Sequence, residues 1–331
     1  MSGPDGPLVL GLDVGATTTR GVLTDLTGRR LGSALAAGGN PQAQGGRAAA
    51  ERIGAVLRDA LGDHDPARLG ACVIGLAGYR RFATDAAAVA FAEECRAAAG
   101  PAVPGSLRPA LRPDAEVAFA AGTRAADGVV LIGGTGAVAC RLQRRRVSST
   151  RGGQGWLLGD EGSGFWIGRE AARHALDALG AGSGAPDALT AAVLAALEVP
   201  ARPRAGAVAG LLRAVYDAPS TVPAGLAPVV ADAAAAGDPA AARIVTAAAA
   251  RLAALVEAAL PAGAPPEPIV LAGAVAASPG PVREALTAAL AGLPGEVVVA
   301  GDTTMAAAWL AARTVVPGTP HEAFLPPAGE V

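Results

Sequence analysis

The sequence predicts an α/β protein that contains a duplicated domain, and two similar segments carry this prediction. Each segment runs from a short apolar strand through a turn of glycine and threonine into a second strand, which is the pattern of a β-hairpin. The segments are 8–32 and 128–152. Strands and helices alternate after the first hairpin, which predicts a mixed sheet covered by helices. The separation of about 120 residues indicates one hairpin in each copy of the domain.

The first hairpin has the composition of a phosphate-binding turn. Its apolar strand, 8–12, ends at Asp13, and the residues Gly15-Ala16-Thr17-Thr18-Thr19 follow. Small side chains leave backbone N–H groups and hydroxyls open to an anion. Asp13 beside the turn can orient the waters of Mg²⁺, which prefers oxygen ligands. An ordinary hairpin in which Asp13 caps the turn is the alternative.

The second hairpin repeats this order. An apolar strand over 129–132 leads into Gly133-Gly134-Thr135-Gly136, and a strand over 137–142 follows. Each copy of the domain would therefore offer one turn that can hold phosphate.

The periodicity of the remaining chain predicts further helices and short strands. Helices are expected over 47–61, 84–99, 114–124, 165–179, 187–197, 205–216, 223–236, 239–260, 282–290 and 303–313. Strands are expected over 69–76, 107–113, 268–271 and 296–299, and a loop over 272–281. The expected domains are 1–125 with the first hairpin and 126–315 with the second. A proline-rich, loosely attached tail is expected over 316–331.

Composition narrows the class of protein. Hydrophobic residues make up 51% of the 331 residues and charged residues 17%, so the chain can build a large core. The net charge is −2, and no basic run is longer than Arg144–Arg146, so no nucleic-acid partner is expected. The sequence contains no lysine, which excludes a Walker-type P-loop. Any phosphate must be held by backbone, hydroxyl, metal or arginine.

The three cysteines and the N-terminal residues suggest an intracellular protein. Cys72, Cys95 and Cys140 lack the spacing of a metal site and are expected to be buried free thiols. The start of the chain has no basic segment followed by an apolar one. We therefore expect a cytoplasmic protein with no membrane partner.

The loop after the second hairpin makes a family resemblance specific. Its residues 158–163, LGDEGS, followed by 165–168, FWIG, resemble the signature of N-acetylglucosamine kinases in the BadF/BadG/BcrA/BcrD ATPase family. The two hairpins are similar to the phosphate-binding loops of the sugar kinase, heat-shock protein 70 and actin superfamily. This resemblance implies two ribonuclease-H-like domains of the actin-like ATPase fold, with ATP and Mg²⁺ in an interdomain cleft.

The resemblance also implies roles for individual residues in the nucleotide site. Asp13 would orient Mg²⁺ through water. The remaining nucleotide contacts would come from the two turns and from the loop on the adenosine side: Gly15, Thr17, Thr18, Thr135, Gly136, Gly273 and Ala274.

On the sugar side, the resemblance implies that Asp114 is the catalytic base and contacts the substrate. A carboxylate beside the reacting hydroxyl can accept its proton, although an N-cap of the following helix is the alternative for Asp114. Asp160 matches an acid that binds sugar hydroxyls. The other expected substrate contacts are Asn40, Gly78, Gly153, Gln154 and Glu161.

The chain departs from the family pattern at two places. Ala137 stands where the second phosphate motif usually has serine, so one hydroxyl donor is missing. Gln154 stands where the sugar loop usually has tryptophan, and the aromatic residue is displaced to Trp156. These differences bear on the identity of the sugar more than on the reaction.

The expected function is ATP-dependent phosphorylation of N-acetylglucosamine to its 6-phosphate, by a homodimer. Gln154 can bond an amide, whereas a free amine is a cation that wants a carboxylate. Glucosamine is the alternative sugar, and Glu161 is the residue that would pair with its ammonium. Two other classes remain open, namely the ATPase activator of a dehydratase and a sugar-sensing protein of the same fold.

Overall fold

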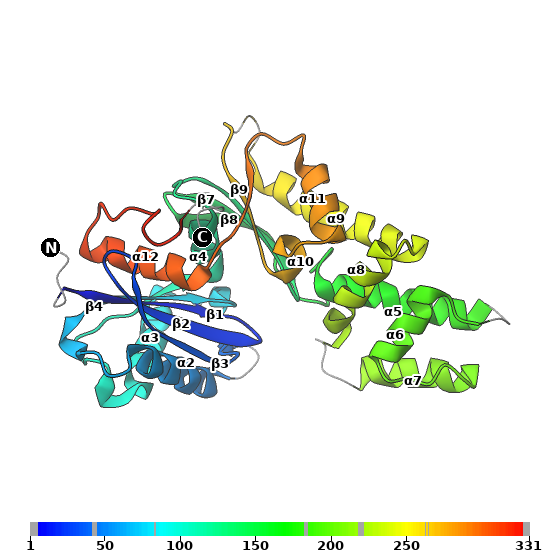
Figure 1. Ribbon diagram of the computed structural model, residues 1–331, viewed down its shortest axis with the longest axis horizontal. Helices are drawn as coiled ribbons and strands as arrows, with labels where there is room; N and C mark the ends of the chain where they lie inside the picture. The colour runs from blue at the N-terminus through cyan, green and yellow to red at the C-terminus, as the bar shows by residue number, and fades with distance from the viewer. Residues whose placement is uncertain are drawn as a thin grey trace. The chain divides into compact units, whose positions relative to one another are not determined.

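The computed structural model describes residues 6–41, 45–82, 84–181, 185–217, 222–261, 263 and 265–326. These residues form two compact units, each an α/β domain with a five-stranded sheet (Figure 1). Within the described ranges, the first unit contains 6–126, 144–147 and 300–326, and the second contains 127–143 and 148–299.

The sheet of the first unit begins with the predicted hairpin. Its strands are β1 (Leu8–Val14), β2 (Thr18–Asp25), β3 (Arg30–Ala37), β4 (Leu69–Leu76) and β5 (Ala110–Pro113). Their order is β3-β2-β1-β4-β5. The strand β2 is antiparallel to both β1 and β3, whereas β4 is parallel to both β1 and β5.

Helices bury both faces of this sheet. The helices on one face are α2 (Gly46–Leu61) and α3 (Asp85–Ala98), and those on the other are α4 (Asp114–Gly122) and α12 (Thr303–Val315). Leu10 and Leu12 belong to the core under α2 and α3, while Val9 belongs to the core under α4 and α12. Successive strand residues point to opposite faces, so a continuous apolar strand serves both cores.

The last helix and the tail do not lie where the sequence predicts. We expect them in or after the second domain, but α12 packs on β1 of the first unit. A Cβ added at Gly11 would lie 2.2 Å from the backbone nitrogen of Ala308. The tail is also anchored, because Phe324 is buried and the indole N–H of Trp309 donates to the carbonyl of Thr319 at 3.1 Å. The expectation of a loose tail is therefore wrong for 316–326, and 327–331 lie outside the described residues.

The second unit repeats the strand order of the first. Its strands are β6 (Gly128–Gly133), β7 (Ala137–Gln143), β8 (Arg146–Gly152), β9 (Ile269–Ala272) and β10 (Val297–Val299). The sheet order is β10-β9-β6-β7-β8. In both units an antiparallel hairpin supplies the first strand, and a later strand pairs parallel to it. This repetition confirms the predicted duplication.

Most helices of the second unit come between β8 and β9 in the sequence. They are α5 (Gly164–Ala181), α6 (Ala188–Ala196), α7 (Arg204–Tyr216), α8 (Ala227–Ala235) and α9 (Pro239–Ala259), followed after β9 by α10 (Ala274–Ala277) and α11 (Pro281–Leu290). The short helix α10 falls in the segment 272–281 that we expect to be a loop. By length and composition α9 could cross a membrane, but Val245, Leu252 and Val256 on it are buried in the core of this unit.

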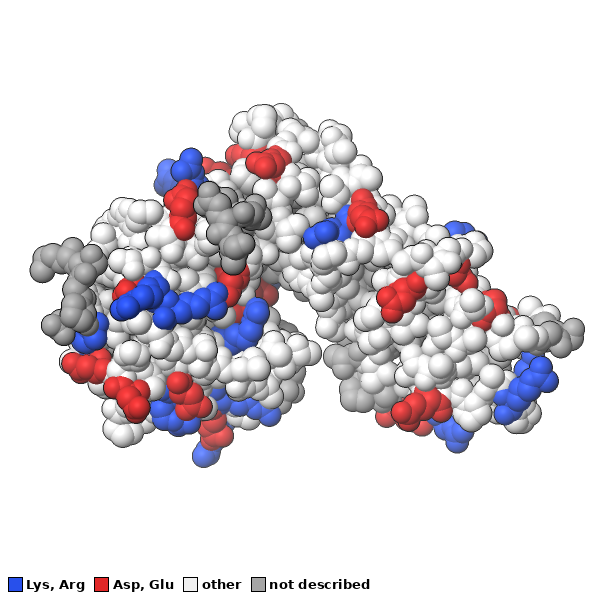
Figure 2. Space-filling view, viewed as in Figure 1, with Lys and Arg blue, Asp and Glu red and all other residues white. Residues whose placement is uncertain are grey.

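Charged side chains are dispersed on the face of the molecule in Figure 2. Acidic and basic groups alternate in small clusters there, with uncharged surface between them. This distribution accords with the small net charge of −2.

Candidate functional site

Three parallel strands of the first unit bring separate motifs to one edge of the sheet. Val14 pairs with Leu76, and Leu76 pairs with Pro113, so β1, β4 and β5 end side by side. The residues that follow these strands therefore share this edge. They include the first turn, Gly78 and Asp114, which the sequence analysis assigns to phosphate, sugar and catalysis.

The first turn is exposed to solvent at its tip, and a neighbouring loop packs against its backbone. The N–H of Gly15 donates to the carbonyl of Thr18 at 2.8 Å, while Thr17 and Thr18 are exposed at the tip. A Cβ at Gly38 would lie 2.0 Å from the carbonyl oxygen of Ala16, so the loop that leads to Asn40 packs directly on the turn. Asn40 lies two residues after this glycine, and its expected contact with the sugar stays a prediction.

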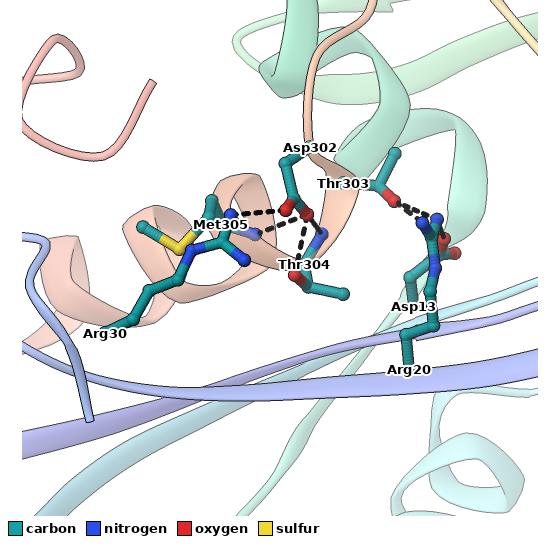
Figure 3. Close-up of polar contacts among 7 residues, drawn as sticks. All are labelled: Asp13, Arg20, Arg30, Asp302, Thr303, Thr304 and Met305. Carbon is teal, nitrogen blue, oxygen red and sulfur yellow. Dashed lines mark hydrogen bonds and ion pairs between the residues drawn. The ribbon is translucent and has the colours of Figure 1, made fainter. Parts of the chain in front are cut away.

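Asp13 forms a closed polar cluster with two residues that the sequence analysis does not select (Figure 3). Its Oδ2 accepts hydrogen bonds from Arg20 Nη2 at 2.7 Å and from the hydroxyl of Thr303 at 2.6 Å. Arg20 Nη2 also donates to Thr303 Oγ1 at 3.0 Å. Arg20 could be found from the alternation along β2, which puts it on the same face as Thr18. Thr303 has no local signal.

The start of α12 fixes the position of Thr303. Asp302 caps this helix by accepting the N–H groups of Thr304 and Met305 at 2.8 and 3.3 Å, and it also pairs with Arg30 (Figure 3). A carboxylate at this position satisfies N–H groups that the helix leaves unpaired. Thr303 is consequently held at the first helical position, where its hydroxyl meets Asp13.

Asp114 has the electrostatics of a general base. Desolvation by the surrounding protein, together with the nearby negative charge of Asp13, raises the pKa of its carboxyl to about 7. Its Oδ1 accepts the N–H of the next residue, Ala115, at 2.9 Å. An N-cap would accept from two or three residues further on, so the capping alternative is not the geometry observed. A carboxyl with a pKa near neutrality can accept a proton and return it.

The second turn is tied to two other segments of its own unit. The N–H of Gly134 donates to the carbonyl of Gly136 at 2.9 Å, and Thr135 is exposed at the tip. The first N–H of α5, that of Gly164, donates to the carbonyl of Gly134 at 2.8 Å. Gly273 has φ of 81°, and a Cβ there would lie 2.5 Å from the carbonyl oxygen of Gly133. The adenosine-side loop, including Ala274, therefore lies against the second turn.

The loop over 152–164, which is expected to bind the sugar, also reaches this turn. Gly153 donates its N–H to the carbonyl of Ala137 at 2.8 Å, and Asp160 Oδ1 accepts the N–H of Ala137 at 3.1 Å. The side chain of Gln154 packs against Gly159, since a Cβ at that glycine would lie 3.1 Å from Gln154 Cβ. Burial raises the pKa of Asp160. The structure thus gathers Gly153, Gln154 and Asp160 at the second turn.

Glu161 differs from its neighbour. Its carboxylate pairs with Arg251 at 2.8 Å and with Arg169 at 3.6 Å, and its side chain is about half exposed. These ion pairs would compete with a substrate contact, and the expected contact of Glu161 with substrate stays a prediction. Trp156 is also half exposed and packs on Phe165, with ring centroids 5.6 Å apart.

A cavity in the second unit adjoins the second turn. It has a volume of about 380 Å³, which is in the range of small-molecule sites. Its lining includes Gly134, Thr135, Ala274, Val275, Asp232 and Arg283. Gly134 and Thr135 of the second turn form part of its wall.

The donor set at the first turn suits magnesium. Asp13 contributes carboxylate oxygens, the threonines contribute hydroxyls, and the carboxylate is partly open to solvent, with a side-chain exposure of 23%. Mg²⁺ prefers oxygen ligands and retains much of its water. The described residues contain no group of three or more His, Cys, Asp or Glu side chains that would form an all-protein metal cage.

Comparison with known proteins identifies similar sequences and structures. The family model described as the BadF/BadG/BcrA/BcrD ATPase family matches residues 10–299. An N-acetyl-D-glucosamine kinase of Dictyostelium discoideum is 29% identical over 181 residues, which cover 52% of this chain and 54% of that protein. The chain thus spans about half the length of this curated relative.

Two solved structures are similar over most of the chain. A candidate N-acetylglucosamine kinase from Chromobacterium violaceum has a TM-score of 0.68 and 25% identity, with 93% of this chain and 99% of that chain covered. Another from Porphyromonas gingivalis has a TM-score of 0.72 and 22% identity, with 94% and 99% covered. The second similarity concerns the fold alone. The architecture is that of actin-like ATPases.

Proposed function

Because the chain belongs to the BadF/BadG/BcrA/BcrD ATPase family, we propose that it is an ATP-dependent kinase that phosphorylates N-acetylglucosamine at its 6-hydroxyl. The family contains N-acetylglucosamine kinases and also dehydratase activators. The reaction would form a bond between the hydroxyl oxygen and the terminal phosphorus of ATP and would release ADP.

The observation that carries the proposal is the raised pKa of Asp114 at the edge that holds the first turn. A sugar hydroxyl is a poor nucleophile unless a base accepts its proton as the phosphorus–oxygen bond forms. The carboxyl of Asp114 has a pKa of about 7, which suits this task near neutral pH. Asn40 and Gly78 on neighbouring loops would orient the sugar.

The nucleotide would use groups on both turns. Gly15, Thr17 and Thr18 offer N–H groups and hydroxyls, and Thr135 and Gly136 offer the same on the second turn. Gly273 and Ala274 would contact the adenosine. Magnesium, when bound beside Asp13, would supply positive charge that neutralises the phosphates.

The choice of the acetylated sugar rests on Gln154 and Glu161. Gln154 offers a neutral donor and acceptor that can pair with an amide. Glu161, the residue that would favour glucosamine, is paired with Arg251 and Arg169. Asp160 would remain for the sugar hydroxyls.

A dehydratase activator would need exposed cysteines that hold an iron–sulfur cluster. All three cysteines of this chain are buried, and burial raises the thiol pKa of Cys72 and Cys95 well above the usual range. Thiols of this kind are poor metal ligands. A sugar sensor would not need a base with the pKa of Asp114.

The direct test is a coupled ADP-release assay over a panel of amino sugars and hexoses. We expect turnover that requires both ATP and sugar and that is fastest with N-acetylglucosamine. Iron in the purified protein would indicate a dehydratase activator instead of a kinase. ATP turnover in the absence of sugar would indicate an uncoupled ATPase. The homodimer and the cytoplasmic location remain predictions.

A further inference from the structure

We propose that Arg20 is the phosphate-binding cation of the first turn, and that it exchanges between the carboxylate of Asp13 and the terminal phosphate when magnesium and nucleotide bind together. The inference deepens the proposed function and rests on the nucleotide site described above. It assigns a role to a residue that neither the motifs nor the family resemblance selects.

The composition of the chain leaves arginine as the side-chain cation that can bind the terminal phosphate. The sequence contains 27 Lys and Arg residues in total and no lysine, and its three histidines are outside the predicted motifs. Phosphoryl transfer spreads negative charge over the terminal phosphate, so a cation at that point contributes directly to catalysis. Guanidinium is always charged and matches phosphate with two N–H donors.

The position of Arg20 puts its guanidinium at the first turn. Thr18 and Arg20 are exposed on β2, and the intervening Thr19 is fully buried. Residues two apart on a strand face the same side, so Arg20 and Thr18 lie on the same face of β2. Its Nη2 reaches Asp13 at the end of the adjacent strand, 2.7 Å away.

The ion pair between Arg20 and Asp13 can open, so that the guanidinium can leave Asp13 for a phosphate. The side chain of Arg20 is 49% exposed, and exposed ion pairs are weak because water competes for both partners. Thr303 donates to the same Asp13 oxygen at 2.6 Å. Asp13 therefore keeps one donor when the guanidinium leaves, and its position does not depend on Arg20.

Charge balance predicts the direction of the exchange. Arg20 neutralises Asp13, so a divalent cation that approaches the protein alone meets both a neutralised ligand and a neighbouring positive charge. A triphosphate brings enough negative charge to accept the guanidinium and to share the metal. Arg20 would thus disfavour metal without nucleotide and favour the two together, which is a coupling between two ligands.

The test compares three variants with the wild type. Arg20→Gln removes the charge and Arg20→Lys keeps it, while Arg29→Gln is the matched control, because Arg29 also forms an exposed pair, with Asp25 in the same unit. Binding of MnCl₂ to the nucleotide-free protein is measured by electron paramagnetic resonance. Binding of a non-hydrolysable ATP analogue and of ADP, each with MgCl₂, is measured by calorimetry.

We expect Arg20→Gln to bind Mn²⁺ at least about fivefold more tightly and the ATP analogue at least about tenfold more weakly, with a smaller loss for ADP. Arg20→Lys should stay within about threefold of the wild type for the analogue, and Arg29→Gln should change neither affinity. Equal analogue affinity in Arg20→Gln and wild type, or weaker Mn²⁺ binding in that variant, overturns the proposal. If the wild type binds the analogue and Arg20→Gln behaves as expected while no sugar is phosphorylated, the kinase proposal fails and the role of Arg20 stands.

Discussion

Asp160 and Ala137 are joined by a hydrogen bond of 3.1 Å from the backbone N–H of Ala137 to Asp160 Oδ1. The bond connects the acidic loop with the second turn, at the position where the family usually has serine. Asp160 has φ of 58°, in the left-handed region that Asp and Asn tolerate better than other side chains. Backbone conformation and hydrogen bond together hold the carboxylate at the turn.

Asp160→Asn tests whether this carboxylate serves the sugar. The amide keeps an acceptor for Ala137 and tolerates the same φ, so we expect Tm to stay within about 2 °C. Loss of the charge should raise KM for the sugar at least about tenfold, because hydrogen bonds from hydroxyls to a charged group are the stronger ones. KM for ATP should not rise. A change confined to ATP would move Asp160 from the sugar site to the phosphate turn.

Asp114→Asn should lower kcat on the order of a hundredfold or more, because the amide cannot accept the proton of the hydroxyl. In the wild type, kcat/KM should rise with pH and level off above about 7, where the carboxyl is ionised. The residual activity of the variant should not show this rise with pH. Calorimetry should show that sugar binding is largely retained. A variant with near-normal turnover would remove Asp114 from the mechanism.

The same substitution should change how stability depends on pH. The carboxyl pKa of Asp114 is raised from 3.8 to about 7 in the folded state, so the folded protein binds this proton more tightly than the unfolded chain. Stability from this group is therefore lost as pH rises from about 4 to about 7. Asn does not titrate, so Asp114→Asn should gain about 1–4 kcal/mol of unfolding free energy over the wild type between pH 4 and pH 8. Urea unfolding of both proteins at the two pH values measures this, and a constant difference would contradict it.

Gln154→Glu should shift the preference between sugars. A carboxylate at this position would pair with the ammonium of glucosamine. It would also lack the amide N–H that can donate a hydrogen bond to the acetamido carbonyl. We expect the ratio of kcat/KM for N-acetylglucosamine over glucosamine to fall at least about tenfold, which corresponds to about 1.4 kcal/mol. An unchanged ratio would place the acetamido group away from Gln154.

Glu161→Gln should leave that ratio within about twofold, because Glu161 is held by Arg251 and Arg169. The loss of these exposed ion pairs should lower stability by no more than about 1 kcal/mol. If glucosamine is the preferred sugar of the wild type and Glu161→Gln abolishes the preference, Glu161 is the specificity residue and the acetylated sugar is not the substrate.

The sequence by itself determined the duplicated α/β architecture. Apolar strands such as β1 and β6 and the glycine-threonine turns after them are local patterns, and each specifies a hairpin without help from distant residues. The same locality explains why Asp13 could be selected, since it stands where a strand meets a glycine-threonine turn, whereas the roles of Asp114 and Asp160 came from the family resemblance.

Tertiary structure alone decided the surroundings of these residues. Thr303 meets Asp13 across 290 residues of sequence, and Arg251 reaches Glu161 across 90. The pKa of Asp114 depends on how much protein surrounds its carboxyl and on the charge of Asp13, and neither follows from neighbours in the chain. Local periodicity says which side of an element is apolar, but it does not say which distant element covers that side, because desolvation and charge pairing are set by three-dimensional packing.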